Sequence, residues 1–206
     1  MPETRRNHKP SPASGARHVV LGVTGSIGAY KAADLVRRLR ERDCIVTCVM
    51  THEACEFITP LTLQVLSERR VVTDLFNREE TGIVHTTLAD EASVVLIAPA
   101  TAQVIAKLAH GLADDPITCI ALATRAPILL APAMNVHMLD HPATQENLST
   151  LRQRGCRTIG PQHGSLACGY DAVGHLSEVE EIVEATFGAL AGSGSGRQAT
   201  RRHGRS

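Results

Sequence analysis

A glycine-rich stretch, GVTGSIGAYK at residues 22–31, is the first segment whose residue types and spacing suit chemistry. It follows an apolar run and precedes an amphipathic segment, so it forms the turn between a predicted strand and a predicted helix. Thr24 and Ser26 bring two hydroxyl groups to the start of that helix, where backbone N–H groups and the helix dipole favour an anion. The stretch suits one phosphate monoester, with a tight packing turn as the alternative interpretation.

The two commonest phosphate-binding patterns do not match this stretch. The dinucleotide fingerprint G-x-G-x-x-G requires glycine two residues after its first glycine, but the residue two after Gly22 is Thr24. A P-loop requires Ser or Thr directly after its lysine, whereas Lys31 is followed by Ala32 and comes too late in the chain. These spacings leave open which phosphate compound the turn would bind.

Three further segments carry residues that are unusual in structural loops. They are VHTTLA at residues 84–89 with a lone His85, PAMN at residues 132–135, and SLACG at residues 165–169 with Cys168. Each has a structural interpretation when taken alone: a capping histidine, the start of a helix, and a buried thiol. Their chemistry therefore depends on where the fold places them.

The elements that must position these residues alternate between strand and helix. Apolar runs such as SVVLIA and PILLA predict strands that are buried on both faces, as in a parallel sheet. Ser177 is the expected N-cap of the last helix, with Glu180 at its third position. The predicted strands are 18–23, 45–50, 93–98, 127–131 and 156–159, and the predicted helices are 29–42, 60–66, 101–110, 142–154 and 177–190.

This alternation predicts an α/β fold, a single doubly wound parallel sheet with right-handed crossovers. Ligands of such folds bind beyond the carboxyl ends of the strands. Four segments are expected to meet there: 25–28, 51–53, 99–103 and 132–138.

Composition narrows the classes of partner. The 206-residue chain has a formal net charge of zero and 2% aromatic residues, which argues against a nucleic-acid surface. No apolar run approaches the length of a membrane span, and the start of the chain lacks the features of a secretory signal. None of the six cysteines forms a CxxC pair, so reduced thiols and a cytoplasmic location are expected. We expect a disordered arm at 1–17, one domain at 18–190 and a disordered Gly/Ser/Arg tail at 191–206.

Taken together and in this order, the segments resemble a known family. GSIGAYK, VMTHEA, VHTTLA, APATAQVIAKLAHGLADD, PAMNVHM and GSLACG are similar to those of the homo-oligomeric flavin-containing cysteine decarboxylases. The resemblance covers residues 18–185. This family includes phosphopantothenoylcysteine decarboxylase of coenzyme A biosynthesis and enzymes that decarboxylate the C-terminal cysteine of ribosomally made peptides.

The resemblance implies a flavodoxin-like or Rossmann-like flavoprotein domain that binds FMN, with FAD as the alternative. The phosphate at the glycine turn would then be that of the flavin. It also implies a homo-trimer or a dodecamer with the flavin at a subunit interface, so that His85 acts on a flavin bound partly by a neighbouring chain. The implied cofactor-binding residues are Gly25, Ser26, Ile27, Thr51, Ala100, Thr101, Ala102, Gln103, Ala133 and Met134.

Catalytic roles also follow from the resemblance. His85 would be the base that handles the thiol or an adjacent proton, and Asn135 would hold the substrate carboxylate. Cys168 would be the acid that protonates the enethiol carbon when the reduced flavin returns its electrons. Met138, Leu166 and Ala167 would complete the substrate-binding set.

The substrate stays open between two classes at this point. Asp90 and Glu91 stand where the coenzyme A enzymes have a basic residue and commonly a Trp, which favours oxidative decarboxylation of a peptide ending in cysteine. Cys168 keeps phosphopantothenoylcysteine decarboxylation as the alternative, because some peptide-modifying members lack this cysteine. A non-catalytic flavin-binding regulatory protein is a minor alternative.

Overall fold

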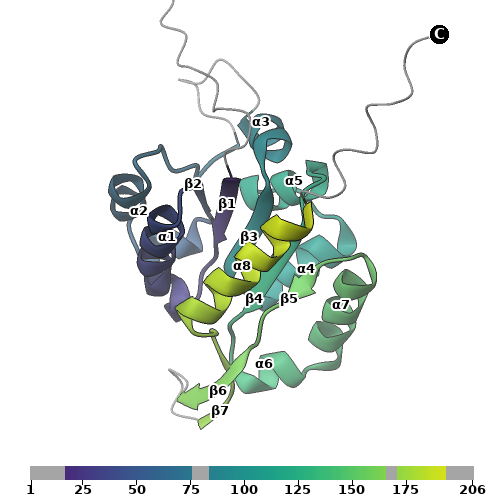
Figure 1. Ribbon diagram of the computed structural model, residues 1–206. Coiled ribbons are helices and arrows are strands. Elements are labelled where there is room, and N and C mark those ends of the chain that lie inside the picture. The colour runs from purple at the N-terminus through teal and green to yellow at the C-terminus, as the bar shows by residue number, and fades with distance from the viewer. Residues whose placement is uncertain (1–16, 76–83, 166–170, 194–206) are drawn as a thin grey trace, which may run out of the picture.

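The computed structural model describes residues 17–75, 84–165 and 171–193 (Figure 1). Five strands form one parallel sheet, and two further strands form an antiparallel hairpin. The sheet strands are β1 (Arg17–Val23), β2 (Cys44–Met50), β3 (Val94–Ala100), β4 (Ile128–Pro132) and β5 (Arg157–Thr158), and the hairpin strands are β6 (Gln162–Ser165) and β7 (Asp171–His175).

Eight α-helices and two short 3-10 helices lie in the described part of the chain. The 3-10 helices are η1 (Ile27–Lys31) and η2 (Glu53–Glu56). The α-helices are α1 (Ala32–Glu41), α2 (Pro60–Ser67), α3 (Val84–Glu91), α4 (Ala102–His110), α5 (Pro116–Ala123), α6 (Val136–Asp140), α7 (Pro142–Gln153) and α8 (Val179–Ser193).

The strand order of the sheet is β2-β1-β3-β4-β5. This is the flavodoxin-like order, in which the connections reverse direction between β1 and β3 and ligands bind outside the carboxyl ends of those strands. The predicted doubly wound α/β sheet is confirmed. The order also places the glycine turn after β1 and the 99–103 segment after β3 side by side.

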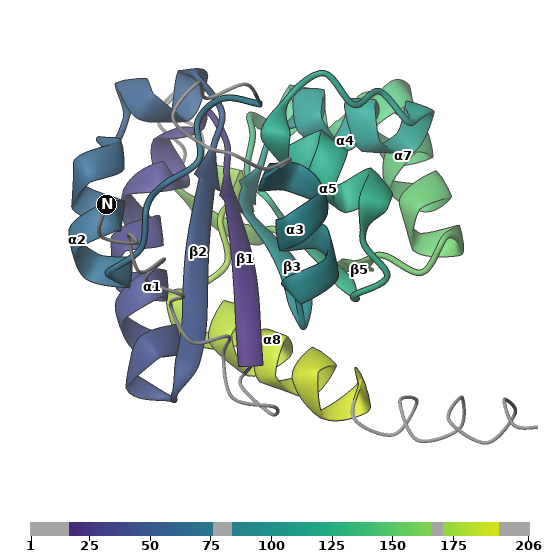
Figure 2. The ribbon, with the colours of Figure 1, turned by 90° about the horizontal axis from the view of Figure 1, so that it is seen from above.

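Two apolar clusters cover the two faces of the sheet. Alternate residues of β1 point into opposite clusters, with Leu21 in one and Val20 in the other. Helices α1, α2 and α8 close the first cluster, and α3, α4, α5 and α7 close the second. Figure 2 shows these helices on the two sides of the strands. Burial on both faces explains why β3 reads as a continuous apolar run.

The structure differs from the sequence-based prediction at several element ends. The helix expected at 29–42 begins as η1, in which Ala29 N–H bonds the carbonyl of Ser26, and only then becomes α1. The predicted cap at Ser177 is wrong, because α8 begins at Val179 and the buried Ser177 hydroxyl has no hydrogen-bond partner among the described residues. At the ends of the predicted domain, β1 already includes Arg17 and α8 continues to Ser193.

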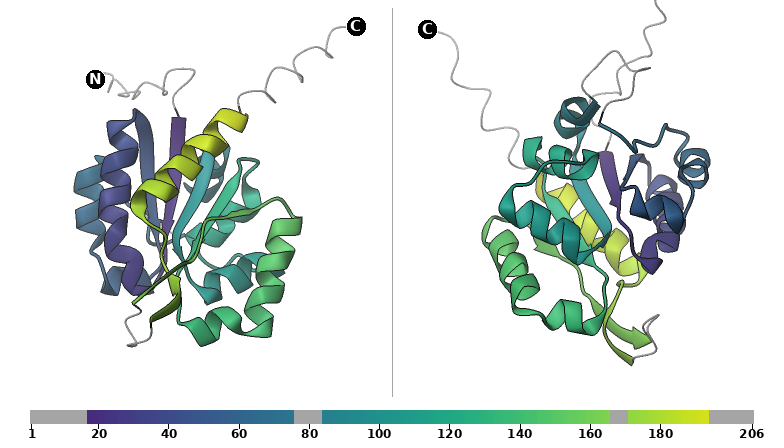
Figure 3. Two further views of the ribbon diagram at one scale, coloured as in Figure 1. Left: turned by 60° about the horizontal axis from the view of Figure 1, so that its bottom comes forward. Right: turned by 180° about the vertical axis from the view of Figure 1, so that it is seen from behind.

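Helix α5 and the β6–β7 hairpin are absent from the prediction. Residues 117–123 are almost uniformly apolar and show no helical period, although Asp115 followed by Pro116 is a helix-start signal. The hairpin projects from the same end of the molecule as α6, away from the main sheet (Figures 1 and 3). Residues 166–170, which include Leu166, Ala167 and Cys168, lie outside the described residues.

Cys44 and Cys48 are buried, and burial raises the pKa of the Cys48 thiol to about 12. Among the described helices, none has the length and apolar character needed to cross a membrane.

Candidate functional site

The carboxyl edge of the sheet is joined by a row of hydrogen bonds. Thr51 N–H donates to Val23 across β2 and β1 at 3.1 Å, and Ala133 N–H donates to Ala100 across β4 and β3 at 3.1 Å. Between β1 and β3 the link is the hydroxyl of Thr24. The four segments that the sequence predicts to meet at this edge are thus held beside one another.

The glycine turn packs closely against η2. A methyl group built on Gly25 would overlap the Cβ of Glu53, so only glycine allows this approach. The half-buried Ser26 makes no side-chain capping bond at the start of η1. Its hydroxyl is therefore not used to cap the helix that follows.

Thr24 does not behave as the sequence suggests. Its side chain is 1% exposed, and its hydroxyl donates to the carbonyl of Pro99 at 2.7 Å and accepts from Thr101 N–H at 3.1 Å. The interpretation of Thr24 as a phosphate-binding hydroxyl is therefore wrong, because both of its hydrogen-bonding functions are used inside the protein. Ser26 is the remaining hydroxyl of the turn.

A cavity of about 370 Å³ opens beside this edge. Two of the predicted cofactor residues, Thr51 and Gln103, line it. Its volume lies within the usual range for small-molecule sites. The remaining lining residues are His52, Glu53, Thr73, Asp74, Leu75, Val104, Lys107, Asp114, Asp115 and Pro116.

An ion cluster that the sequence analysis did not assign forms one wall of this cavity. Lys107 Nζ lies 2.7 Å from Asp114 and 3.1 Å from Asp115, and its hydrogen bond to Asp114 raises the pKa of the lysine. Asp115 also caps α5, since its side chain accepts from Thr118 N–H at 3.0 Å. The cluster fixes the start of α5 against α4.

The other predicted cofactor residues lie along the same edge. Ala100 and Ala133 are buried at the ends of β3 and β4, whereas Gln103 and Ile27 are exposed. Thr101 caps α4 by accepting from Val104 N–H at 3.4 Å, and Ala102 is the first residue of that helix. These residues lie where a ligand site at the strand ends is expected. Their role in binding a cofactor stays a prediction.

Asn135 and Met134 connect the main sheet with the hairpin. Asn135 is the N-cap of α6, and its Oδ1 accepts from His137 N–H at 2.8 Å. Met134 N–H donates to Gly174 of β7 at 3.0 Å. Met138, on the exposed side of α6, is 50% exposed. The end of β7 therefore lies beside the PAMN segment.

His85 lies in the first turn of α3 and has an unusual environment. Its Nδ1 is buried and has no hydrogen-bond partner among the described residues. A buried polar nitrogen without a partner is uncommon and costs free energy. Such an atom points to a partner outside the described part of this chain.

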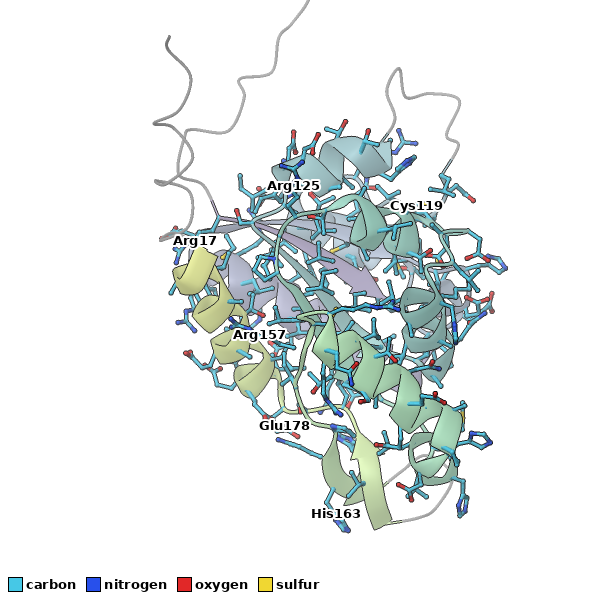
Figure 4. All side chains as sticks on the ribbon, turned by 90° about the vertical axis from the view of Figure 1, so that its right-hand side faces the viewer. Arg17, Cys119, Arg125, Arg157, His163 and Glu178 are labelled. Carbon is cyan, nitrogen blue, oxygen red and sulfur yellow. The ribbon has the colours of Figure 1, made fainter. Side chains whose placement is uncertain are left out.

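Within one chain the structure does not bring His85 and Asn135 together. Helix α3 lies at one end of the molecule, and α6 lies with the hairpin at the other end (Figures 1 and 3). Figure 4 shows the same separation between Arg125, beside the α3 end, and His163 on the hairpin. The predicted base and the predicted carboxylate-binding residue are at opposite ends of the molecule.

The last residue of α3, Glu91, lies beside a network around the buried His18 that the sequence analysis missed. Arg69 Nε donates to Thr47 Oγ1 at 2.9 Å, and Thr47 Oγ1 lies 2.8 Å from His18 Nε2. On the other side of the ring, His18 Nδ1 lies 3.6 Å from Glu91. Only the lone histidine at the start of a strand could have signalled this network.

Comparison with known proteins gives the family. The sequence profile of the flavoprotein family matches residues 7–191. The chain belongs to the flavoprotein family.

Two relatives of this flavoprotein differ in length. It is 48% identical to the coenzyme A biosynthesis bifunctional protein CoaBC of Bacillus subtilis, over 82% of this chain and 42% of that protein. The chain thus spans less than half the length of this bifunctional relative. It is 41% identical to a protein of Streptococcus mutans named "probable phosphopantothenoylcysteine decarboxylase", over 82% of this chain and 96% of that protein.

Solved structures share the fold of this flavoprotein. A PPC decarboxylase mutant in complex with pantothenoylaminoethenethiol matches with a TM-score of 0.77 and 31% identity, over 84% of this chain and 97% of that one. The FMN-dependent cysteine decarboxylase SpaF matches with a TM-score of 0.74 and 32% identity, over 85% and 97%. The predicted fold and family are confirmed. The preference for a peptide substrate is not, because the relatives of 41–49% identity carry names from coenzyme A biosynthesis.

Proposed function

We propose that this chain is an FMN-dependent phosphopantothenoylcysteine decarboxylase. The observation that carries the proposal is the 41% identity to the Streptococcus mutans protein of that name, which extends over 96% of its length. Because this relative is matched almost from end to end, the similarity does not depend on a second domain.

The carboxyl edge of the sheet fits FMN. The close approach of Gly25 to Glu53 leaves backbone and the Ser26 hydroxyl, rather than a bulky side chain, at the start of η1. Such a turn suits a phosphate. The adjoining cavity has an acidic lining that includes Asp74, Asp114 and Asp115, which disfavours a phosphate there. The phosphate would therefore lie at residues 25–28.

When bound, the flavin supplies the two-electron oxidation of the substrate thiol that makes loss of CO2 feasible. The protein must then place a base at the thiol and a donor at the carboxylate. His85 is the proposed base, and its buried, unpartnered Nδ1 supports a role with a group from outside the described chain. In Asn135 the capping bond uses the carbonyl oxygen, so the NH2 group is the end that would donate to a carboxylate.

The separation of these two residues supports a site shared between subunits. Within one chain α3 and α6 lie at opposite ends (Figure 1). A ring of identical chains can bring α3 of one copy to the carboxyl edge of the next. We infer a homo-oligomer in which His85 of one chain acts on a substrate held by Asn135 of its neighbour, and a trimer or a dodecamer built of trimers satisfies this requirement.

A peptide ending in cysteine is the second candidate substrate. The 32% identity to the cysteine decarboxylase SpaF favours it, as do the acidic residues Asp90 and Glu91. However, Glu91 lies beside His18 within the same chain, so this acidic residue has a structural explanation. The argument against a phosphorylated substrate is weaker than the sequence suggested.

Mass spectrometry of the products separates the two candidates. The purified protein with FMN is incubated with phosphopantothenoylcysteine and, separately, with a peptide ending in cysteine. We expect loss of CO2 alone from phosphopantothenoylcysteine. Loss of CO2 together with two hydrogens, from the peptide only, would establish the second candidate and contradict the first.

The Cys168→Ser variant tests the final reduction. If Cys168 supplies the proton that completes this step, the variant should convert phosphopantothenoylcysteine to an enethiol that accumulates, because the carbon cannot be protonated. Formation of the saturated thiol at the wild-type rate would remove Cys168 from the mechanism.

A further inference from the structure

The segments of the proposed flavin site are joined in series across the carboxyl edge. Thr51 bonds Val23, Thr24 bonds the segment after β3, Ala133 bonds Ala100, and Met134 bonds Gly174 of the hairpin. Three of these four links are bonds between backbone groups. The link between β1 and β3 is the one in the series that depends on a side chain.

The Thr24 hydroxyl makes this link from a buried position. It donates to Pro99 at 2.7 Å and accepts from Thr101 N–H at 3.1 Å, so it holds one backbone group at the end of β3 and one at the N-cap of α4. Thr101 in turn caps α4, whose second residue, Gln103, lines the cavity. Beyond the last paired residues of the two strands, Gly22 and Ile97, one hydroxyl therefore joins the end of β3 and the start of α4 to the glycine turn.

We propose that Thr24 is a positioning residue of the flavin site, holding residues 99–103 against the glycine turn without touching the cofactor. The proposal rests on the proposed binding of FMN at this edge. Thr24 lies between β1 and β3, where the connections of the sheet reverse direction. In the series of hydrogen bonds along the carboxyl edge, its hydroxyl is the side chain that joins the segments following these two strands.

Loss of the hydroxyl would leave two polar groups without their partner. In Thr24→Val, a residue of similar shape, the Pro99 carbonyl and the Thr101 N–H would each lose a hydrogen bond. The backbone would have to move to satisfy them, because buried unpaired groups are costly. The movement would separate residues 99–103 from residues 25–28.

Thr186 offers a matched control. It is 0% exposed, and its hydroxyl donates to Ile182 within α8 at 2.7 Å, so Thr186→Val also removes a buried hydroxyl and its bond. Helix α8 is not part of the carboxyl-edge series. Thr186→Val should lose less stability than Thr24→Val, because the Ile182 carbonyl keeps its backbone hydrogen bond within α8, and it should leave the flavin site unchanged.

The test measures FMN affinity of the apoprotein by flavin fluorescence, and deuterium uptake of the peptide 99–104 without FMN. We expect Thr24→Val to weaken FMN binding at least about tenfold and to raise the uptake, with Thr186→Val within about twofold of wild type in affinity. Thr24→Ser, which keeps the hydroxyl, should restore both. If Thr24→Val does not fold, Thr24→Ala compared with Thr24→Ser isolates the hydroxyl.

Two results are adverse, and they are distinguishable. Wild-type FMN affinity in Thr24→Val, or equal affinities in Thr24→Ala and Thr24→Ser, would overturn the positioning role and leave the proposed function intact. A wild-type protein that binds no FMN would contradict the proposed function itself and with it the flavin role of Thr24.

Discussion

At the scale of single residues, two histidines near the ends of α3 have opposite environments. The ring of His18 has neighbours on both nitrogens, Thr47 on one side and Glu91 on the other. The Nδ1 of His85 is buried without a partner among the described residues. The environment of His18 is typical of a structural residue. The environment of His85 is typical of a residue that contacts a ligand or another chain.

His85→Asn tests the proposed base. Because the amide cannot take up a proton, we expect decarboxylation to fall by at least about 100-fold. FMN should remain bound, since α3, which carries His85, contains none of the proposed cofactor-binding residues. Product formation and bound-flavin absorbance are measured on the same preparation. Loss of the flavin would instead assign His85 a structural role.

His18 should make stability depend on pH. Burial, helped by the charge of Arg69, lowers the pKa of His18 from 6.5 to about 4. The ring is therefore neutral at pH 7, and its approach to Glu91 is not an ion pair there. Above pH 6.5 the stabilisation is complete. As the pH falls from 6.5 to 4, the unfolded chain binds a proton that the folded chain does not, so stability is lost.

The measurement compares wild type with His18→Gln by urea unfolding. Between pH 7 and pH 5 the wild type should lose about 2 kcal/mol more than the variant, because the other titrating groups are common to both proteins. Equal losses in the two proteins would show that Glu91 compensates for burial of the charged ring.

At the scale of elements, the β1–η1 turn determines how closely η2 can approach. Gly25 meets the Cβ of Glu53, and its segment leads into η1 and α1. The sequence predicts a tight glycine turn here from the spacing of glycines between a strand and a helix. The sequence could not predict which element packs against that turn, because the parallel pairing of β1 with β2 brings η2 there.

Gly25→Ala tests this contact. The added methyl group would force the turn away from η2, so we expect a loss of about 1–3 kcal/mol and weaker FMN binding. Gly188→Ala is the control, because nothing lies within 4 Å of a methyl group at this helical position. That variant should be as stable as wild type or more so. Unchanged FMN affinity in Gly25→Ala would remove the turn from the site.

At the scale of the whole molecule, the proposed catalytic residues face different neighbours. Helix α3 and helix α6 lie at opposite ends of the folded molecule, so the proposed site is complete only if a second copy supplies one of them (Figure 1). The activity of mixed oligomers can therefore test whether the proposed site is shared between two chains. The β6–β7 hairpin lies at the α6 end and would face the same neighbour.

Mixed oligomers of two inactive variants test the shared site. His85→Asn lacks the base, and Asn135→Asp keeps the acceptor that caps α6 but loses the NH2 donor. When the two are unfolded and refolded together, about a quarter of the shared sites should contain both native residues. We expect activity to return in that proportion. No recovery, although mixed oligomers form, would mean that one chain supplies the whole site.

The alternation of strand and helix patterns and the glycine turn were sufficient to predict the α/β class. Strands buried on both faces appear in the sequence as continuous apolar runs, and helices with one apolar face appear as a helical period. The resemblance in six short segments supplied the family. Tertiary structure alone decided the hydrogen bonds of Thr24, the network around His18 and the separation of α3, which carries His85, from α6, which Asn135 caps. Those depend on which strands are neighbours and which ends of the sheet the loops occupy, and local sequence does not record contacts between residues far apart in the chain.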